Sequence, residues 1–220
     1  MRKLTWLLGA AFIAAASVAN ALELKEGKHY TSYNPPQATE ARDRVEVTEF
    51  FWFGCGHCFN LEPHLHKWLK KLPKDVSFRR IPAVFPGRDG GPGNWAPAAR
   101  LFYSLEAMGI EEKLHNEIFD AIHIERQTRI IFDDKVMLDF LAKKGVDTKK
   151  FSDIYNSFAI QGKVRGAMQA SQAHGLDSVP ALIVDGRYKP IAAGESGSAD
   201  DIFMIVDGLI DKARKDRGKK

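Results

Sequence analysis

Residues 45–72 read VEVTEFFWFGCGHCFNLEPHLHKWLKKL and predict a strand, a two-cysteine motif and a helix in direct succession. The first eight residues are rich in β-branched and aromatic side chains, which is typical of a buried strand. From Phe59 onward, apolar residues recur at the spacing of an amphipathic helix. Cys55 therefore stands where the strand passes into the helix, and Cys58 lies one turn inside. These are the only two cysteines of the 220-residue chain.

The rest of the chain continues an α/β order with a block of helices in its middle. A second strand is predicted over 76–81, followed by a loop rich in glycine and proline over 86–97. Helical patterns then occupy five segments, which are 98–108, 111–122, 133–144, 149–158 and 161–174. Two strands, 181–184 and 187–191, are joined by Asp185-Gly186, a hairpin signature, and a last helix covers 200–212. The predicted fold is an α/β layer with a helical domain inserted between the second strand and the C-terminal hairpin.

The first 21 residues carry the pattern of a secretory signal peptide. A positively charged start is followed by an apolar run over 4–16 and by small residues at 19–21. The run is shorter than a membrane span requires. We therefore expect cleavage after Ala21 and export of a mature chain of about two hundred residues, long enough to bury its own core.

The charge balance of the mature chain is mild. The formal charge of +4 includes Arg2 and Lys3, and removing both leaves +2. The excess lies in the segment 212–220, which we expect to be a frayed, solvated end. This pattern predicts no nucleic-acid partner.

Two cysteines separated by two residues are compatible with several kinds of site. Haem attachment requires a histidine directly after the second cysteine, where this chain has Phe59. Zinc requires four ligands, whereas only two cysteines exist and His57 lies between them, so no metal is expected. A purely structural disulfide would close a loop too small to stabilise the chain much. A redox-active Cys55–Cys58 disulfide, which needs no other cofactor, is the favoured interpretation.

The position of the motif assigns different properties to its two sulfurs. A thiolate at a helix N-terminus faces unpaired backbone N–H groups and the positive end of the helix dipole, which lower its pKa. Cys55 should therefore be the exposed, low-pKa sulfur and Cys58 the buried one. His57 would stabilise the Cys55 thiolate further, the alternative being a solvated helix residue. Each unit by which the thiol pKa falls below ambient pH makes the disulfide about 30 mV more oxidising.

These features resemble the thioredoxin superfamily and, within it, the DsbA family of periplasmic thiol:disulfide interchange proteins. The matching residues are EFF at 49–51 before CGHC at 55–58, and SVP at 178–180 before ALIVDG at 181–186. The resemblance implies a periplasmic location and a thioredoxin-like domain built from residues 22–87 and 165–220. Residues 88–164 would form the inserted helical domain.

The same resemblance implies roles for residues away from the cysteines. Val179–Pro180 would be a cis peptide bond that faces the cysteines and binds the substrate backbone, the alternative being an ordinary trans proline. Glu49 would be a buried acid that relays protons near Cys58, with Arg80 as its charge partner across the sheet. An exposed strand carboxylate is the alternative for Glu49.

The residues between the cysteines depart from the best-known members of the family. Those members carry Pro-His, whereas this chain carries Gly56-His57, a pair that also occurs in eukaryotic disulfide isomerases. Because these residues tune the reduction potential, Gly56 leaves the oxidising strength open.

Three functions follow as hypotheses. The leading one is a monomeric periplasmic oxidase that passes its disulfide to newly exported cysteine-containing proteins and is re-oxidised by a DsbB-type membrane partner. The second is a disulfide isomerase or reductase. Periplasmic isomerases of the superfamily carry an N-terminal dimerisation domain, for which residues 22–54 leave no room. The third is a peptide-binding periplasmic chaperone, consistent with the aromatic run 51–53 beside the motif.

Overall fold

A mixed five-stranded sheet forms the centre of the computed structural model, which describes residues 23–191 and 199–218. In this part of the chain the strands run in the order β1-β5-β4-β2-β3. Their bounds are β1 Tyr30–Ser32, β2 Val45–Phe51, β3 Val76–Pro82, β4 Ala181–Val184 and β5 Tyr188–Pro190. β2 pairs in parallel with β3 and antiparallel with β4, so it lies inside the sheet. The predicted signal peptide, residues 1–21, lies outside the described residues.

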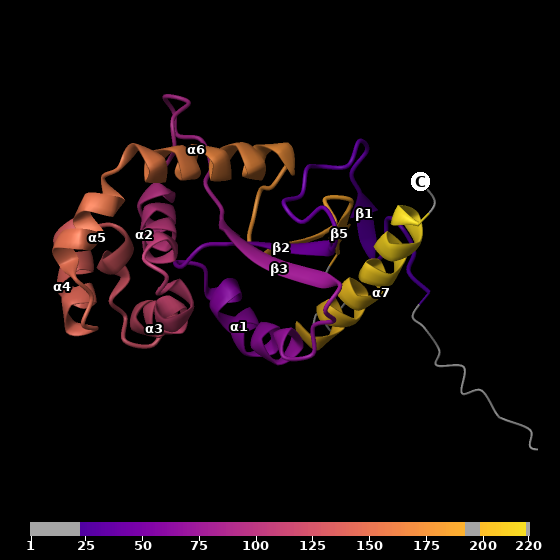
Figure 1. The fold of residues 1–220 in the computed structure, drawn as a ribbon, viewed down its shortest axis with the longest axis horizontal. Helices are drawn as coiled ribbons and strands as arrows, with labels where there is room; N and C mark the ends of the chain where they lie inside the picture. Colours follow the sequence, from indigo (N-terminus) through magenta and orange to yellow (C-terminus); the bar gives the residue numbers. More distant parts are fainter. Residues whose placement is uncertain (1–22, 192–198, 219–220) are drawn as a thin grey trace, which may run out of the picture.

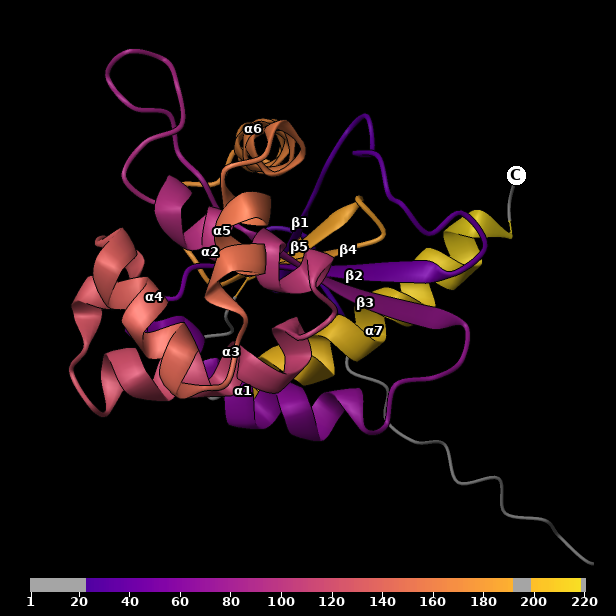
Figure 2. The same cartoon turned by 60° about the vertical axis from the view of Figure 1, so that its left-hand side comes forward.

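Helices cover both faces of the sheet and extend beyond one end of it. α1 (Gly56–Leu69) and α7 (Ala199–Arg217) lie on one face, and α6 (Phe158–Ala173) crosses the other (Figures 1 and 2). The remaining helices gather at one end: α2 Ala96–Ala107, α3 Glu111–His123, the 3₁₀ helix η1 Thr128–Ile131, α4 Asp134–Lys143 and α5 Thr148–Tyr155. Across residues 23–191 and 199–218, none of the helices combines the length and apolar character that a membrane crossing requires.

Two hydrophobic cores hold these layers together. One joins the sheet to α1 and α7, and includes Val47 from β2 and Leu65 from α1. The other joins the end of β2 to the helices of the inserted segment, and includes Phe51 and Cys58. Because side chains alternate along a strand, Glu49 shares the α1 side of β2 with Val47. This register points the Glu49 carboxylate into the interior, on the strand that leads to the cysteine motif.

The predicted fold class and the order of its elements are confirmed. Each predicted helix and strand is present within a few residues of its expected bounds, and the helical insertion stands between β3 and β4. One strand was missed, because β1 has three residues and pairs only with the equally short β5. The Asp185-Gly186 hairpin is also confirmed, and both turn residues have positive φ, 57° and 60°.

The prediction of a frayed C-terminal end is wrong for residues 212–217. α7 continues to Arg217, because its basic side chains bind acids elsewhere in the fold. Arg214 forms hydrogen bonds of 2.7 and 2.8 Å with both carboxylate oxygens of Asp75. Arg217 binds the Asp185 carboxylate in the hairpin turn. The basic residues that predicted a solvated end instead form ion pairs that hold α7 against the sheet.

Candidate active site

Cys55 is the N-cap residue of α1. Its backbone is extended, with φ −89° and ψ 113°, and its Sγ accepts a hydrogen bond from the Cys58 N–H at 3.2 Å. The Cys55 N–H donates to the Trp52 carbonyl at 2.9 Å, which fixes the turn after β2. Both cysteines are free thiols, Cys55 half-buried and Cys58 fully buried. The helix position therefore gives the two sulfurs the difference in burial that the sequence predicts.

The surroundings of the two sulfurs shift their acidities in opposite directions. The hydrogen bond from the Cys58 thiol is the largest cause that lowers the pKa of Cys55 to about 6. Burial opposes this shift, while the N–H groups of Cys58 and His57 support it. Burial, together with the neighbouring Cys55 sulfur, raises the pKa of Cys58 far above its usual range. At neutral pH the reduced site therefore holds a thiolate at Cys55 and a thiol at Cys58.

The two residues between the cysteines occupy the first turn of α1. The His57 side chain is exposed, and its charge is the smallest of the causes that lower the pKa of Cys55. Gly56 is exposed at the first helical position, and a Cβ built on it meets no atom within 4 Å. Backbone and Cys58 donors thus dominate the stabilisation of the thiolate, with His57 as a smaller contribution.

The loop before β4 brings Val179 and Pro180 to the cysteine motif. The Val179–Pro180 peptide bond is cis, as the family resemblance implies. Cys55 Sγ lies 3.4 Å from the Val179 carbonyl oxygen, to which it donates a hydrogen bond when protonated, although 124 positions separate the two residues. The half-buried sulfur and this backbone segment therefore border the same site.

Glu49 and Arg80 form a buried ion pair below the motif. They lie directly opposite each other on β2 and β3, and Arg80 Nε donates to Glu49 Oε2 at 3.1 Å. The Glu49 side chain is fully buried, and burial raises its pKa to about 7 in spite of the Arg80 charge. Its other oxygen, Oε1, is buried and has no hydrogen-bond partner among the described residues. Such an oxygen favours a bound proton, because an unpaired buried charge is costly.

Three further ionisable residues join this pair and were not predicted. The Arg80 guanidinium also donates to Glu62 Oε2 on α1, at 2.9 Å. Glu62 Oε1 lies 3.3 Å from His115 Nε2, and His115 Nδ1 lies 2.5 Å from Glu111 Oε1. Both His115 and Glu111 belong to α3 of the inserted segment. A chain of charges thus runs from Glu49 on the sheet to the helical insertion.

The helical spacing in the sequence already places these unpredicted residues on buried helix faces. Glu62 falls within the apolar stripe of α1, between Leu61 and Leu65, and His115 falls beside Leu114 on the buried side of α3. Glu111 is four residues before His115, the spacing at which helical side chains meet. A charged residue on an otherwise apolar helix face is rarely left unpaired. The identity of each partner, however, depends on contacts between distant segments.

A second histidine of α3 contacts the turn that precedes the motif. His123 Nε2 lies 2.7 Å from the Phe53 carbonyl oxygen, so this nitrogen carries the donated proton. The His123 ring is stacked on Phe59, with centroids 5.0 Å apart and planes 15° from parallel. The helical insertion therefore contacts the cysteine turn through His123 and contacts the charged residues behind it through His115.

The arrangement combines a pair of thiols with a buried carboxyl close enough to influence Cys58. No group of three or more His, Cys, Asp or Glu is placed to hold a metal ion in the part of the chain that the structure describes. The stabilised Cys55 thiolate is a good leaving group, and the buried Cys58 requires a proton whenever its bond to sulfur breaks. The raised pKa of Glu49, about 7, suits proton exchange near neutral pH.

Comparisons with known proteins agree with this chemistry. The family model of the DSBA-like thioredoxin domain matches residues 46–207. The thiol:disulfide interchange protein DsbA of Pseudomonas aeruginosa is 38% identical over 212 residues, covering 94% of this chain and 96% of the relative. The DsbA protein of Burkholderia cepacia is 39% identical over 218 residues, covering 96% and 99%.

Solved structures give the same result for the fold. The crystal structure of Pseudomonas aeruginosa DsbA has a TM-score of 0.78 at 39% identity, with 88% of this chain and 96% of that chain covered. The oxidoreductase NmDsbA1 of Neisseria meningitidis has a TM-score of 0.75 at 27% identity, covering 89% and 96%.

Proposed function

This chain belongs to the DsbA-like thioredoxin family, and on that premise we propose that it is a periplasmic thiol:disulfide oxidoreductase. Its Cys55–Cys58 disulfide is passed to newly exported proteins that contain pairs of cysteines. The observation that carries this proposal is the placement of the two sulfurs: Cys55 is half-buried at the N-cap of α1 and accepts the Cys58 N–H, whereas Cys58 is fully buried. The pKa of Cys55 is lowered to about 6, while that of Cys58 is raised.

The reaction begins when a substrate thiolate attacks the Cys55 sulfur of the disulfide. The bond between Cys55 and Cys58 breaks, and its electron pair goes to Cys58. Cys58 is buried, so it leaves as a thiol and takes up one proton. We assign that proton to Glu49, whose fully buried carboxyl lies near enough for its charge to raise the pKa of Cys58. Arg80 is assigned the role of holding the Glu49 carboxylate once the proton has left.

The reaction ends when a second substrate thiolate attacks the substrate sulfur of the mixed disulfide. A substrate disulfide forms, and Cys55 departs as a thiolate held by the N–H of Cys58 at 3.2 Å. His57 is assigned a minor electrostatic role in this step, consistent with its exposed position. The two electrons removed from the substrate remain on the reduced cysteine pair.

The substrate backbone is assigned to the segment at Val179 and Pro180. The Val179 carbonyl is within 3.4 Å of the attacked sulfur, which supports this placement. Gly56 leaves open space above the first turn of α1, because no atom lies within 4 Å of a Cβ built there. A polypeptide that approaches Cys55 over Gly56 would therefore meet little steric hindrance.

The rest of the proposal concerns location, partners and domains. The chain acts in the periplasm after cleavage at Ala21, as a monomer, and a DsbB-type membrane protein re-oxidises its cysteine pair. Residues 22–87 and 165–220 form the thioredoxin-like domain, and residues 88–164 form the inserted helical domain. Contacts of α2 with α3, α5 and η1 support a separate helical unit, and α6 crosses the proposed boundary.

The test is to trap the cysteine states in cells with an alkylating reagent. An oxidase should be found mainly as the disulfide. In the Cys58→Ser variant the Cys55 thiolate can attack disulfides of exported proteins, releasing one substrate thiolate, but no second cysteine resolves the product, so mixed disulfides should accumulate, whereas its matched control Cys55→Ser should form none.

Each alternative function predicts a different result. A mostly reduced pool would contradict the oxidase and favour an isomerase or reductase. Full cellular function in Cys55→Ser would contradict thiol chemistry altogether and favour a chaperone.

A further inference from the structure

Five ionisable side chains from four elements form one buried cluster beneath the cysteine motif. In the order in which they contact one another they are Glu49 on β2, Arg80 on β3, Glu62 on α1, and His115 and Glu111 on α3. Successive contacts along this order measure 3.1, 2.9, 3.3 and 2.5 Å. α3 lies beside α1 in both views of the fold, which places the insertion against the redox domain (Figures 1 and 2).

The contacts of His115 determine which protons the cluster can hold. Both ring nitrogens face carboxylate oxygens, which only accept hydrogen bonds when ionised. Two such contacts are satisfied at once if the imidazole is charged and donates from both nitrogens. Burial lowers the pKa of His115, but the hydrogen bonds to Glu111 and Glu62 outweigh burial and raise it overall.

The remaining surroundings of His115 are apolar aromatic rings. The rings of Phe51, Phe53 and Phe119 lie with their centroids 5.1 to 5.2 Å from the imidazole centroid, and Phe102 lies at 6.4 Å. A cation is attracted to such rings, but phenyl rings do not exchange protons with the two ring nitrogens of His115. The charge of His115, which is 2% exposed, therefore depends on the two carboxylates, with the Arg80 charge acting against it.

Counting charges shows what the imidazolium does for Glu49. The cluster has three carboxyls and only one permanent cation, Arg80. With His115 charged, the cluster is neutral when Glu49 holds a proton and carries one negative charge when Glu49 releases it. With His115 neutral, the same release would leave two uncompensated buried negative charges, which is far more costly. The imidazolium also lowers the pKa of Glu49, which burial raises.

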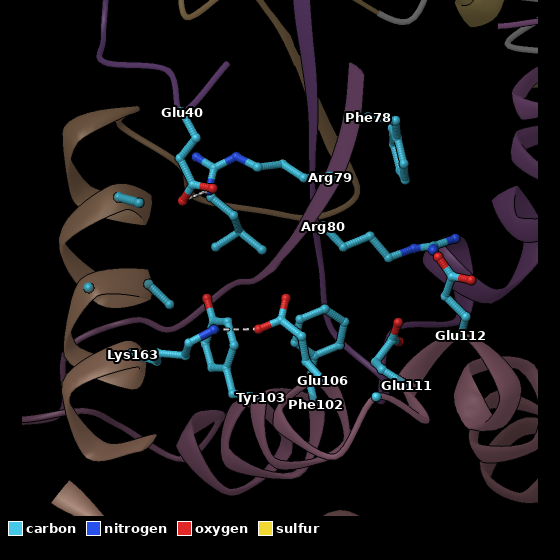
Figure 3. Close-up of a pocket in the computed structure, with 15 residues that line it drawn as sticks. Glu40, Phe78, Arg79, Arg80, Phe102, Tyr103, Glu106, Glu111, Glu112 and Lys163 are labelled. Carbon is cyan, nitrogen blue, oxygen red and sulfur yellow. Dashed lines mark hydrogen bonds and ion pairs between the residues drawn. The ribbon is translucent and has the colours of Figure 1, made fainter. Parts of the chain in front are cut away.

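Two members of the cluster border solvent, although His115 itself is only 2% exposed. Arg80 and Glu111 line an open pocket of about 700 Å³ between β3, α2, α3 and α6 (Figure 3). Glu111 is 9% exposed, whereas Glu49 at the other end is fully buried. On the α1 side, His66 Nδ1 approaches Glu62 at 3.7 Å. The cluster therefore extends from the pocket lining at Arg80 and Glu111 to the fully buried Glu49 near the cysteine motif.

We propose that His115 is a positioning residue of the inserted helical segment. Its imidazolium is the second cation of the cluster, after Arg80, and lets Glu49 ionise beside Cys58. The inference rests on the proposed function in one respect, namely that Glu49 exchanges protons with Cys58. It gives the insertion an electrostatic part in the redox reaction. His115 touches neither cysteine, so its effect passes through Glu62 and Arg80.

The test is the carboxyl titration of Glu49, followed by carbon NMR in the disulfide form of the full chain, where no thiol titrates. A Glu49→Gln sample assigns the signal. In His115→Gln the midpoint should rise by about one pH unit or more, which is a tenfold fall in the ionisation constant. In the double variant His115→Gln with Glu111→Gln, one acid is removed with the cation, so the midpoint should return towards the wild-type value.

The controls separate charge from packing. His174→Gln removes a half-buried histidine outside the cluster, one that binds the Ala170 carbonyl, and it should leave the Glu49 midpoint unchanged. An unchanged midpoint in His115→Gln, or no recovery in the double variant, would overturn the proposal.

Nitrogen NMR of the wild-type protein gives a measurement that requires no variant to fold. Both ring nitrogens of His115 should be protonated at neutral pH, and a neutral tautomer there would overturn the proposal. Neither NMR experiment depends on oxidase activity. If only the proposed function fails, the cysteine pair will be found mostly reduced in cells. The Glu49 midpoint will still be shifted in His115→Gln.

Discussion

Raising the pH from about 5 to about 8 should stabilise the reduced protein through Cys55. The folded site lowers the pKa of this thiol from 9.0 to about 6, chiefly through the Cys58 thiol and backbone donors. A group whose folded pKa is depressed contributes stability above its unfolded pKa and loses it as the pH falls through the folded value. The contribution of Cys55 should therefore be absent at about pH 5 and large at about pH 8.

The expected size follows from the two acidities. Between about pH 5 and about pH 8, pKa values of about 6 folded and 9.0 unfolded give an upper limit of about 2.6 kcal/mol in the free energy of unfolding. Cys55 is only half-buried, so solvent screening reduces this amount. We expect a rise of about 1–2 kcal/mol that belongs to Cys55.

Other groups titrate in the same range with the opposite sign. The pKa of Glu49 is raised to about 7, so its contribution is present below its unfolded value and lost as the pH rises through about 7. The pKa of His115 is also raised, and its contribution is lost in the same direction. The Cys55→Ala variant retains both groups, so the difference between wild type and variant isolates the thiolate.

The assay is guanidinium unfolding of both proteins in the presence of a reductant, followed by circular dichroism. The wild-type advantage over Cys55→Ala should grow by about 1–2 kcal/mol across this pH range. A difference that stays constant to within about 0.3 kcal/mol, or that shrinks, would refute the stabilised thiolate.

Three further changes test the Glu49–Arg80 ion pair and the backbone geometry of two turns. Arg80→Met leaves two buried carboxylates without their permanent cation and should cost about 3–5 kcal/mol in urea unfolding. Gly56→Pro places proline at the first position of α1, where Cys55 already has the extended backbone that precedes proline. It should stabilise the protein by about 0.4–1 kcal/mol and leave the thiolate titration unchanged. Gly186→Ala would bring a Cβ to 2.1 Å from the Gln37 carbonyl oxygen at φ +60°, and should lower stability by more than about 1 kcal/mol.

An exposed apolar residue provides the common control for these three variants. Phe158 is 87% exposed, so Phe158→Ala should change the free energy of unfolding by less than about 0.5 kcal/mol. An Arg80→Met protein as stable as this control would contradict a buried ion pair. A destabilised Gly56→Pro or a neutral Gly186→Ala would contradict the backbone geometry of the respective turn.

Local sequence signals were sufficient wherever neighbouring residues determine the structure. The run from β2 through Cys55 into α1 combines a β-rich strand, an N-cap and an apolar helical stripe, and all three agree. The same applies to the Asp185-Gly186 turn, where the residue types demand positive φ. The different burial of Cys55 and Cys58 followed from helix position alone.

Contacts between distant segments account for what the sequence did not reveal. β1 has no pattern of its own, because its three residues are ordered by β5, some 160 positions later. The end of α7 is held by Asp75 and Asp185, which a view of the basic tail in isolation cannot include. In the same way, His115 meets Glu62 only after the inserted helices fold against α1.

The reduction potential of the Cys55–Cys58 pair distinguishes a disulfide donor from a reductant. The protein would be equilibrated in buffers of reduced and oxidised glutathione, and the reduced fraction would be measured by alkylation. The pKa of Cys55, about 6, lies about one unit below that of the thioredoxin cysteine, about 7, and therefore predicts a pair at least about 30 mV more oxidising than thioredoxin. A potential near about −270 mV, the value of the reductant thioredoxin, would contradict a disulfide donor.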